Sequence, residues 1–493
     1  MRVSRFEVPS RMAGVRRPAA SRGHPMLQIR RALVAAIAVS FSCSGSEGAS
    51  PLLVAPVLPD TVVTVPGVPV IPQPGSFDES IAVDARVLHQ AMEGFGTAVR
   101  LFSDPHVIGR NGGIENGLDI SKADEDEILR RLYQQIGLTR IRSALQTPGI
   151  EAANDNDNPL ITDISRFQFK WVFGDGHIDL LRRVRALGVT TWWLSPGTLE
   201  QWMDEGSAAE YVEWTMAVLR HWRDAGAEPP FHSIINEPTH PRANVSGAFI
   251  HDVVKLLGPR LKAENFATKL VISDDIHAYH AVASAKPTLE DPETRQYIAA
   301  LAFHLYDHPV EASGLMKALA DQYGLPLWMS EFAVAGDFME WAVIMHRLIS
   351  EYNVSAVDYV WGFFGSFDTQ QLVRIDYAGS RYLGHVPLMQ FYTTGQFSKY
   401  VRPGAKRIAA TSSAGAVKAS AFLRDGRATI VVINERDVAV RARVSLSGIS
   451  GAGSVTLVRT SSTEQMATIG RVEISGDAFT VELPARSIST LVQ

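Results

Sequence analysis

The sequence contains a single cysteine, Cys43, among 493 residues. One cysteine cannot form an intrachain disulfide, and it makes a metal site built from thiolates implausible. The chain also lacks an excess of positive charge, because its net charge is -5 and its isoelectric point is near 6.3. This balance argues against nucleic acid as a partner. Neutral polysaccharides or small sugars suit such a surface, and no cofactor is expected.

Long apolar runs are missing as well. Arg30 and Arg31 precede the apolar run A-L-V-A-A-I-A-V-S-F-S, which is too short to span a bilayer and directly precedes Cys43. This pattern predicts a secretory signal within residues 1–50, with Met26 as a candidate start. We expect Cys43 to be lipidated, as in a bacterial lipoprotein, so that the protein is exported and tethered to the envelope. Plain secretion is the alternative, and so is an incidental cysteine in a discarded peptide.

Residues 51–78 are rich in proline, valine and glycine and follow neither a helical nor a strand period. Proline recurs too often for this stretch to pack as a regular element. We therefore predict a semi-rigid linker. A linker that is ordered against the folded domain is the alternative.

Strand-like and helical segments alternate through residues 79–390, which predicts a parallel α/β architecture. Eight strand candidates favour a (β/α)8 barrel, the first of them at Gly94-Phe95-Gly96. The helical period disappears in residues 391–493, where period-two alternation between glycine, aspartate and serine turns predicts a β-sandwich.

The stretch F-H-S-I-I-N-E-P, residues 231–238, ends a buried strand with a carboxylate. Pro238 cannot donate to a strand ladder and favours an extended backbone at Glu237. We expect Glu237 just past the carboxyl end of a parallel strand, which is the catalytic edge of a barrel. Asn236 offers donors and an acceptor to a hydroxyl-rich ligand. For N-E-P alone, an ordinary β–α turn is the alternative.

A second carboxylate, Glu331, ends the seventh strand candidate, L-P-L-W-M-S-E-F. Arg142 lies near the carboxyl end of the second strand candidate, and His304 and Tyr306 share one face at the end of the sixth. We expect Arg142 and Tyr306 to keep Glu331 ionised, by charge and by hydrogen bonding. Glu237, in contrast, would need to be protonated at rest.

Two carboxylates on one rim are the groups that hydrolyse a glycosidic bond. One protonates the departing oxygen, and the other attacks the anomeric carbon or activates water. A spacing of about 5 Å gives a covalent intermediate and retention, whereas about 6.5 Å or more inverts the configuration. The sequence does not give this distance directly.

Two other patterns suggest metal ions. Residues 151–158, E-A-A-N-D-N-D-N, have the aspartate and asparagine density of a calcium loop but not the spacing of an EF-hand, so we expect a solvated loop. His304 and His308 have a spacing that suits zinc on a helix, but they flank a strand end and a loop. We therefore predict no metal.

Tryptophan is unusually dense near the third strand candidate, at Trp192, Trp193 and Trp202. Aromatic faces stack on sugar rings, so these residues could form a platform. Adjacent strand residues point to opposite sides, so one of the first pair must face the helices. We predict substrate-binding or supporting roles for Trp193 and for Trp361, near the rim end of the eighth strand candidate.

Several motifs together resemble glycoside hydrolase family 30, a clan A family of retaining enzymes. They are I-N-E-P, W-M-S-E-F, G-F-G, S-P after the third strand, F-H-L-Y, the run Y-T-T-G-Q-F-S-K-Y-V-R-P-G-A-K-R-I and the ending L-P-A-R-S-I-S-T-L-V. The resemblance covers residues 80–493. It implies Glu237 as acid/base, Glu331 as nucleophile, Asn236 as a binder of a substrate hydroxyl, and Arg142 and Tyr306 as supports of the nucleophile. It also implies that residues 80–90 contribute a strand to the sandwich.

The chain is most similar to the bacterial xylan-degrading branch of this family, with two departures. An aromatic residue usually follows S-P in that branch, where this chain has S-P-G-T-L-E-Q-W-M. The segment V-W-G-F-F-G-S-F-D-T-Q-Q lacks the basic group with which glucuronoxylan-specific members grip a glucuronate. We therefore predict a retaining β-glycosidase, xylan-directed, endo or exo, and monomeric. A β-1,6-glucanase or glucosylceramidase-type enzyme and a non-catalytic glycan-binding protein are the alternatives.

Overall fold

The computed structural model describes residues 68–104, 107, 117–145, 149–170, 174–306, 309–334, 336–365, 369–449 and 453–493. All of these described residues belong to one compact unit. Within the described ranges, no helix combines the length and the apolar character needed to cross a membrane. The predicted signal with Cys43, and also His308, lie outside the described residues.

Eight parallel strands close into a barrel. β9 pairs with β8 on one side and with β2 on the other, so the ring has no open edge. The barrel predicted from the alternating pattern is thus confirmed, and each strand falls on its expected segment. The strands are β2 (Gly94–Ala98), β3 (Arg140–Leu145), β4 (Thr191–Pro196), β5 (Phe231–Ser233), β6 (Lys269–Asp275), β7 (Ile298–His304), β8 (Leu327–Glu331) and β9 (Ala356–Phe364).

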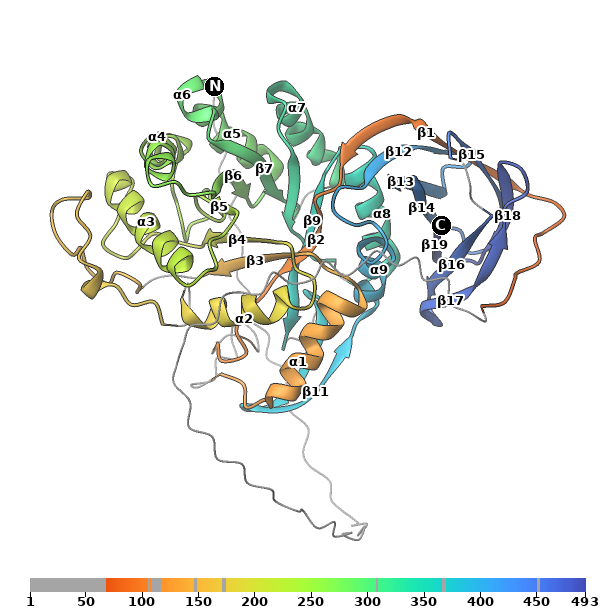
Figure 1. Cartoon of the computed structure of the whole chain (residues 1–493), viewed down its shortest axis with the longest axis horizontal. Helices are drawn as coiled ribbons and strands as arrows, with labels where there is room; N and C mark the ends of the chain where they lie inside the picture. The colour runs from red at the N-terminus through yellow and green to blue at the C-terminus, as the bar shows by residue number, and fades with distance from the viewer. Residues whose placement is uncertain are drawn as a thin grey trace, which may run out of the picture. The chain divides into compact units, whose positions relative to one another are not determined.

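Helices connect successive barrel strands (Figure 1). Polar side chains cap several of them; for example, Ser246 accepts a hydrogen bond from the Phe249 amide at 3.2 Å. A β-hairpin of β10 (Gln371–Ala378) and β11 (Arg381–Pro387) follows β9 before the last helix. The helical segments are α1 (Lys122–Arg130), η1 (Arg131–Gln135), η2 (Ile164–Arg166), α2 (Asp175–Arg185), α3 (Ala208–Asp224), α4 (Gly247–Ala263), α5 (Ala278–Glu290), α6 (Pro292–Arg295), η3 (Val310–Ala312), α7 (Ser313–Tyr323), α8 (Phe338–Ser350) and α9 (Met389–Ser398).

Large side chains fill the barrel interior. The Trp328 ring meets Trp193 and Phe231 edge to face, with ring centroids 5.6 Å and 5.0 Å apart. Arg140 lies over the Trp328 ring at 4.3 Å and pairs with the buried Asp358 at 3.0 Å. The barrel is therefore a packed core and not a pore, and its chemistry is confined to the rim.

The second domain is a nine-stranded sheet that encloses its own apolar core. β1 belongs to this sheet, antiparallel to β12 and parallel to β15, before the chain enters the barrel at β2 (Figure 1). This arrangement agrees with the strand that the family resemblance implied. The strands are β1 (Glu79–Ala91), β12 (Lys406–Ser412), β13 (Val417–Arg424), β14 (Arg427–Asn434), β15 (Val440–Ser447), β16 (Ser454–Ser461), β17 (Glu464–Glu473), β18 (Ala478–Leu483) and β19 (Ser487–Val492).

Residues 68–78, the end of the predicted linker, lie against this second domain. Val70 forms a β-bridge with Arg471, and the amide of Ile71 donates to the Arg471 carbonyl at 2.7 Å. The Gln73 side chain accepts a hydrogen bond from the Thr480 amide at 2.7 Å. Residues 68–78 are therefore ordered against the folded domain, which was the alternative to a semi-rigid linker.

Candidate active site

Glu237 lies four residues past the end of β5 in a left-handed backbone conformation, with φ of 49°, and not in the extended conformation that was expected before Pro238. The left-handed conformation is strained for a glutamate and needs support from its surroundings. The Glu237 amide donates to the Asp274 carbonyl at 2.8 Å, and the Asn236 amide donates to the Pro196 carbonyl at 2.7 Å. The ends of β4 and β6 therefore fix the backbone that carries Asn236 and Glu237.

Glu331, the last residue of β8, accepts hydrogen bonds at both carboxylate oxygens. Arg142 Nη1 donates to Oε2 at 2.6 Å, and the Tyr306 hydroxyl donates to Oε1 at 3.0 Å. Burial opposes the charge of Arg142, but Asp274 and Glu331 outweigh it and raise the pKa of the guanidinium. Burial and the Glu331 charge raise the pKa of Tyr306, which stays a neutral donor. The structure thus brings Arg142 and Tyr306 to Glu331, where the sequence predicted them.

Asp274, at the end of β6, is a site residue that the sequence analysis missed. Its side chain is fully buried and accepts hydrogen bonds from Arg142 at 3.2 Å, Ser195 at 2.5 Å and Ser330 at 2.7 Å. Burial alone would raise the pKa of Asp274, but Arg142 and His304 lower it below the usual range. Asp274 therefore holds Arg142 in place beneath Glu331, and the acidic end of I-S-D-D was the only signal for it.

His304 lies between the two predicted catalytic carboxylates. Its Nδ1 is 3.3 Å from Oε1 of Glu237, and its Nε2 is 3.3 Å from Oδ1 of Asp274 and 3.7 Å from Oε2 of Glu331. Burial would lower the pKa of His304, but the surrounding carboxylates raise it to about 10. The imidazole is therefore protonated at neutral pH and bridges the acidic groups.

Arg242 extends from the loop after β5 and donates to Oε2 of Glu237 at 2.9 Å. Burial alone would raise the pKa of Glu237, but His304, Arg242 and His240 lower it to about 2. Glu237 is therefore ionised in the ligand-free site, which differs from the expectation of a carboxyl that is protonated at rest. Arg242 also lines a cavity of about 480 Å³ between the loops after β4 and β5. No sequence pattern marked this arginine.

The spacing of the carboxylates is short. Glu237, His304 and Glu331 each offer one ligand atom, and these atoms lie within 4.8 Å of one another. A closest approach of this size between one oxygen of each glutamate is compatible with the separation of about 5 Å between carboxyl groups that fits direct attack. The three groups are also near enough to hold a metal ion. Each carboxylate oxygen, however, already faces a donor from His304, Arg242, Arg142 or Tyr306.

The tryptophans have different positions. Trp193 is 0% exposed and packs beneath Arg142, which lies over its ring at 5.3 Å, so it offers no face to a substrate. Trp192 faces the helices, where Arg185 lies over it at 4.7 Å. Trp361 is half-buried at the rim and stacks on Phe364 with centroids 5.5 Å apart. The Arg100 guanidinium also lies over the Trp361 ring at 4.8 Å, so of the two predicted tryptophans only Trp361 reaches the solvent at the rim, with its ring already packed by Phe364 and Arg100.

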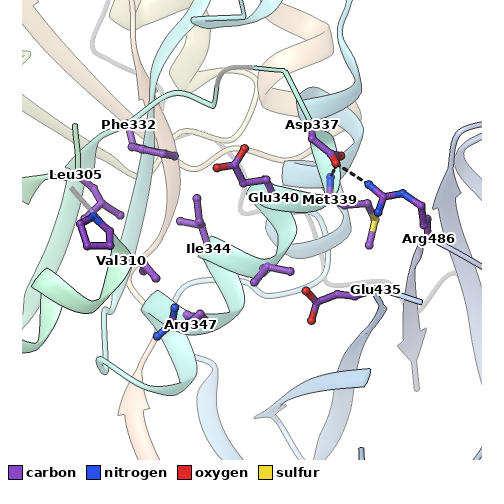
Figure 2. A pocket seen from close by; sticks show the side chains of 12 residues that line it. Leu305, Val310, Phe332, Asp337, Met339, Glu340, Ile344, Arg347, Glu435 and Arg486 are labelled. Carbon is purple, nitrogen blue, oxygen red and sulfur yellow. Dashed lines mark hydrogen bonds and ion pairs between the residues drawn. The ribbon is translucent and has the colours of Figure 1, made fainter. Parts of the chain in front are cut away.

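A second cavity, of about 440 Å³, lies between the barrel and the sandwich (Figure 2). Leu305 and Phe332 line its barrel side, α8 contributes Ile344, and Arg486 comes from the sandwich. Neither Glu237 nor Glu331 lines it. This cavity is therefore separate from the paired carboxylates.

The fold and the site together define a class of protein. Its members have a closed (β/α)8 barrel that carries two glutamates at its strand ends and is joined to a β-sandwich. Residues 404–491 match the family model described as the "Glycosyl hydrolase family 30 beta sandwich domain". With the relatives described next, this match confirms the predicted resemblance to glycoside hydrolase family 30.

A curated relative, glucuronoxylanase XynC of Bacillus subtilis (strain 168), is 28% identical over 217 residues. The alignment covers 42% of this chain and 48% of the relative, so it spans about half of that protein. A GH30 endoxylanase from Clostridium papyrosolvens C71 superposes with a TM-score of 0.66 at 22% identity, over 84% of this chain and 99% of the other. The endo-β1,6-glucanase BT3312 superposes with a TM-score of 0.65 at 18% identity, over 84% and 94%.

Proposed function

We propose that this protein is a retaining β-glycoside hydrolase that cleaves β-linked polysaccharide, with xylan as the leading substrate. The observation that carries the proposal is the close approach of Glu237 and Glu331 on one barrel rim, where one oxygen of each lies within 4.8 Å of the other. The similarity to glucuronoxylanase and to GH30 endoxylanase structures supports xylan.

In the first step, an oxygen of Glu331 bonds to the anomeric carbon while the glycosidic bond breaks. Glu237 gives its proton to the departing oxygen. In the second step, a water oxygen bonds to the anomeric carbon, the Glu331 ester bond breaks, and Glu237 takes the water proton. Arg142 and Tyr306 hold the Glu331 carboxylate in position for attack through hydrogen bonds to its two oxygens.

The proton for the first step has a source in the site. His304 is protonated and its Nδ1 lies 3.3 Å from Oε1 of Glu237. We propose that His304 and Glu237 share this proton, and that a bound sugar which displaces Arg242 favours its transfer to the carboxylate. Glu237 then acts as the acid although it is ionised in the ligand-free site.

Purified mature protein should be incubated with glucuronoxylan, plain β-1,4-xylo-oligosaccharides and β-1,6-glucan, and the products read by mass. Xylose-based products are expected, and their lengths separate endo from exo action. Products that carry a glucuronate at a fixed position would show that the enzyme has a glucuronate-binding site that the sequence did not predict. Proton NMR of the first-formed products should show the β-anomer; an α-anomer would overturn the retaining mechanism.

Two variants test the roles of the carboxylates. Glu331→Gln and Glu237→Gln should each lower kcat on polysaccharide by more than about a hundredfold, while substrate binding stays nearly intact. Glu290→Gln, at the end of α5, is a matched control that should keep full activity. If Glu331→Gln retains turnover, the nucleophile is assigned wrongly. If the wild-type protein binds glycans without turnover, the non-catalytic alternative holds.

A β-1,6-glucanase is the second candidate. Its support is the superposition on an endo-β1,6-glucanase, whose TM-score of 0.65 is nearly the 0.66 of the GH30 endoxylanase. The absence of a basic group in the segment after β9 also separates this chain from glucuronate-gripping enzymes. Cleavage of the glucan alone would select this candidate.

We further propose that the protein is exported from a bacterial cell and held at the envelope through a lipidated Cys43. The charged and apolar stretch before Cys43 supports this location. Mass spectrometry of the protein from its native host should find a diacylglyceryl modification at Cys43. A mature chain that starts beyond residue 43 would show plain secretion instead.

A further inference from the structure

A buried carboxylate outside the active site has no hydrogen-bond partner. Glu213, on α3, is 1% exposed, and neither of its carboxylate oxygens is hydrogen-bonded. Thr162 and Glu210 are the polar groups beside it, but neither reaches its oxygens with hydrogen-bond geometry. An unpaired buried carboxylate is costly, so its presence indicates a missing counter-charge.

The neighbours of Glu213 add negative charge. Glu210, one helical turn earlier, has a buried oxygen, Oε2, that also lacks a partner. Asp155 lies within electrostatic range of Glu213, Asp157 lies within electrostatic range of Glu210, and the Asn154 side chain lies beside Glu210. The acidic loop of residues 151–158 thus folds onto the same face of α3 where Glu210 and Glu213 stand.

A nearby glutamate shows what a purely structural carboxylate looks like in this region. Glu200 accepts hydrogen bonds from the amides of Gly149, Ile150 and Glu151 at 2.7–3.0 Å and from the Trp214 indole at 3.1 Å. Glu213 has no comparable set of donors. The guanidinium of Arg260, the cation of α4 near it, donates to the Pro159 carbonyl at 3.1 Å.

We propose that the loop of residues 151–158 and the Glu210–Glu213 face of α3 form a calcium-binding site. The donors are the carboxylates of Glu210, Glu213, Asp155 and Asp157 and the amide oxygen of Asn154, and Glu151, 1% exposed, stands beside them. An all-oxygen set on an irregular loop suits Ca²⁺, which takes six to eight oxygens, better than Mg²⁺ or zinc. This assignment replaces the solvated loop without metal that the sequence predicted, and it is independent of the proposed glycosidase activity.

The proposed site must contract for one ion to reach all of its ligands. Among the described residues, only the catalytic trio has three ligand atoms within 4.8 Å of one another, so the acidic side chains of this site stand further apart. Like charges keep them separated, and a divalent cation would draw them together. Burial, followed by the charges of the neighbouring acids, raises the pKa of Glu151 and Glu213 to about 7.

Calorimetric titration of EDTA-treated protein with CaCl₂ tests the proposal, together with thermal unfolding in EDTA, CaCl₂ and MgCl₂. We expect one calcium ion per chain and a Tm that rises by several degrees with Ca²⁺ and much less with Mg²⁺. Glu213→Gln should lower the calcium affinity by at least tenfold. It should also raise the Tm of the ion-free protein, because it removes an unpaired buried charge. Asp224→Asn, with a side chain 76% exposed on the same helix, is the matched control and should bind calcium normally.

Several results would overturn the proposal. They are no calcium binding by the wild-type protein, unchanged affinity in Glu213→Gln, or an equal response to Mg²⁺. Glu331→Gln locates the ion, because it alters the catalytic trio and leaves the loop and α3 intact. Calcium binding that is lost in Glu331→Gln would place the ion at the catalytic carboxylates and reject the new site.

Discussion

The backbone amide of Glu237 donates to the backbone carbonyl of Asp274 across 2.8 Å. The Asp274 side chain also holds Arg142, which holds Glu331. One residue at the end of β6 is therefore linked to both predicted catalytic carboxylates, through its main chain to one and through its side chain to the other. Their separation depends on the β6 terminus as much as on β5 and β8.

Asp274→Asn should lower kcat/KM by about tenfold to a hundredfold, because Arg142 loses its buried counter-charge and Glu331 shifts. Steady-state kinetics on the identified substrate measure the effect, and thermal unfolding separates it from a loss of folding. Asp275→Asn alters the next carboxylate, which accepts from Thr239 at 2.8 Å and not from Arg142, so it should stay within about threefold of wild type. Equal losses in both variants would show that Asp274 has no special role.

Arg242→Gln should move the alkaline limb of the kcat/KM profile to higher pH. The Arg242 charge helps to lower the pKa of Glu237 to about 2, so its removal raises that pKa, and the His304–Glu237 pair then keeps its shared proton to higher pH. The pH profile between 4 and 9 on one substrate is the measurement. Arg86→Gln, in the sandwich and 72% exposed, is the control. An unchanged profile in Arg242→Gln would mean that the arginine does not act on Glu237.

Replacement of the two predicted tryptophans should have separable effects. Trp193→Phe should lower the free energy of unfolding by roughly 1–3 kcal/mol and leave KM nearly unchanged, because Trp193 is buried in the barrel. Trp361→Ala should raise KM several-fold with little loss of stability, because Trp361 is half-buried at the rim. Urea unfolding and kinetics of both variants measure this contrast. A large KM effect in Trp193→Phe would contradict its structural role.

The contribution of Glu151 and Glu213 to the stability of the ion-free protein should fall as pH rises from about 4.5 to about 7. Glu151 and Glu213 have folded-state pKa values of about 7, above the ordinary 4.5, so the folded state binds more protons in this window. Their stabilising protons are present at low pH and are lost as pH passes through the folded pKa. Urea unfolding in EDTA at pH 5 and pH 8 measures the slope. Glu213→Gln should reduce the difference in the free energy of unfolding between pH 5 and pH 8. An unchanged difference in this variant would contradict the raised pKa of Glu213.

Much of this architecture could be predicted from local patterns. Each barrel strand is a short apolar run, and Glu237 and Glu331 lie where such runs end. The direction of the Asp274 side chain, toward Arg142, could not be predicted. Ser273 and Asp274 have φ of 73° and 44°, which interrupts the alternation of side chains along β6. The ionised state of Glu237 depends on Arg242 and His304, which only the folded chain brings to it. The partnerless Glu213 is likewise a product of packing between a loop and a helix.

The position of β1 has a consequence for the order in which the chain is made. The Ser80 amide donates to the Ser413 hydroxyl, 333 residues further along the chain, and β1 also needs β15. A ribosome that makes the chain from its N-terminus therefore releases this strand long before its partners exist. Nearly the whole chain must be synthesised before the sandwich can close. β1 therefore remains without its sheet partners for most of the synthesis of the chain.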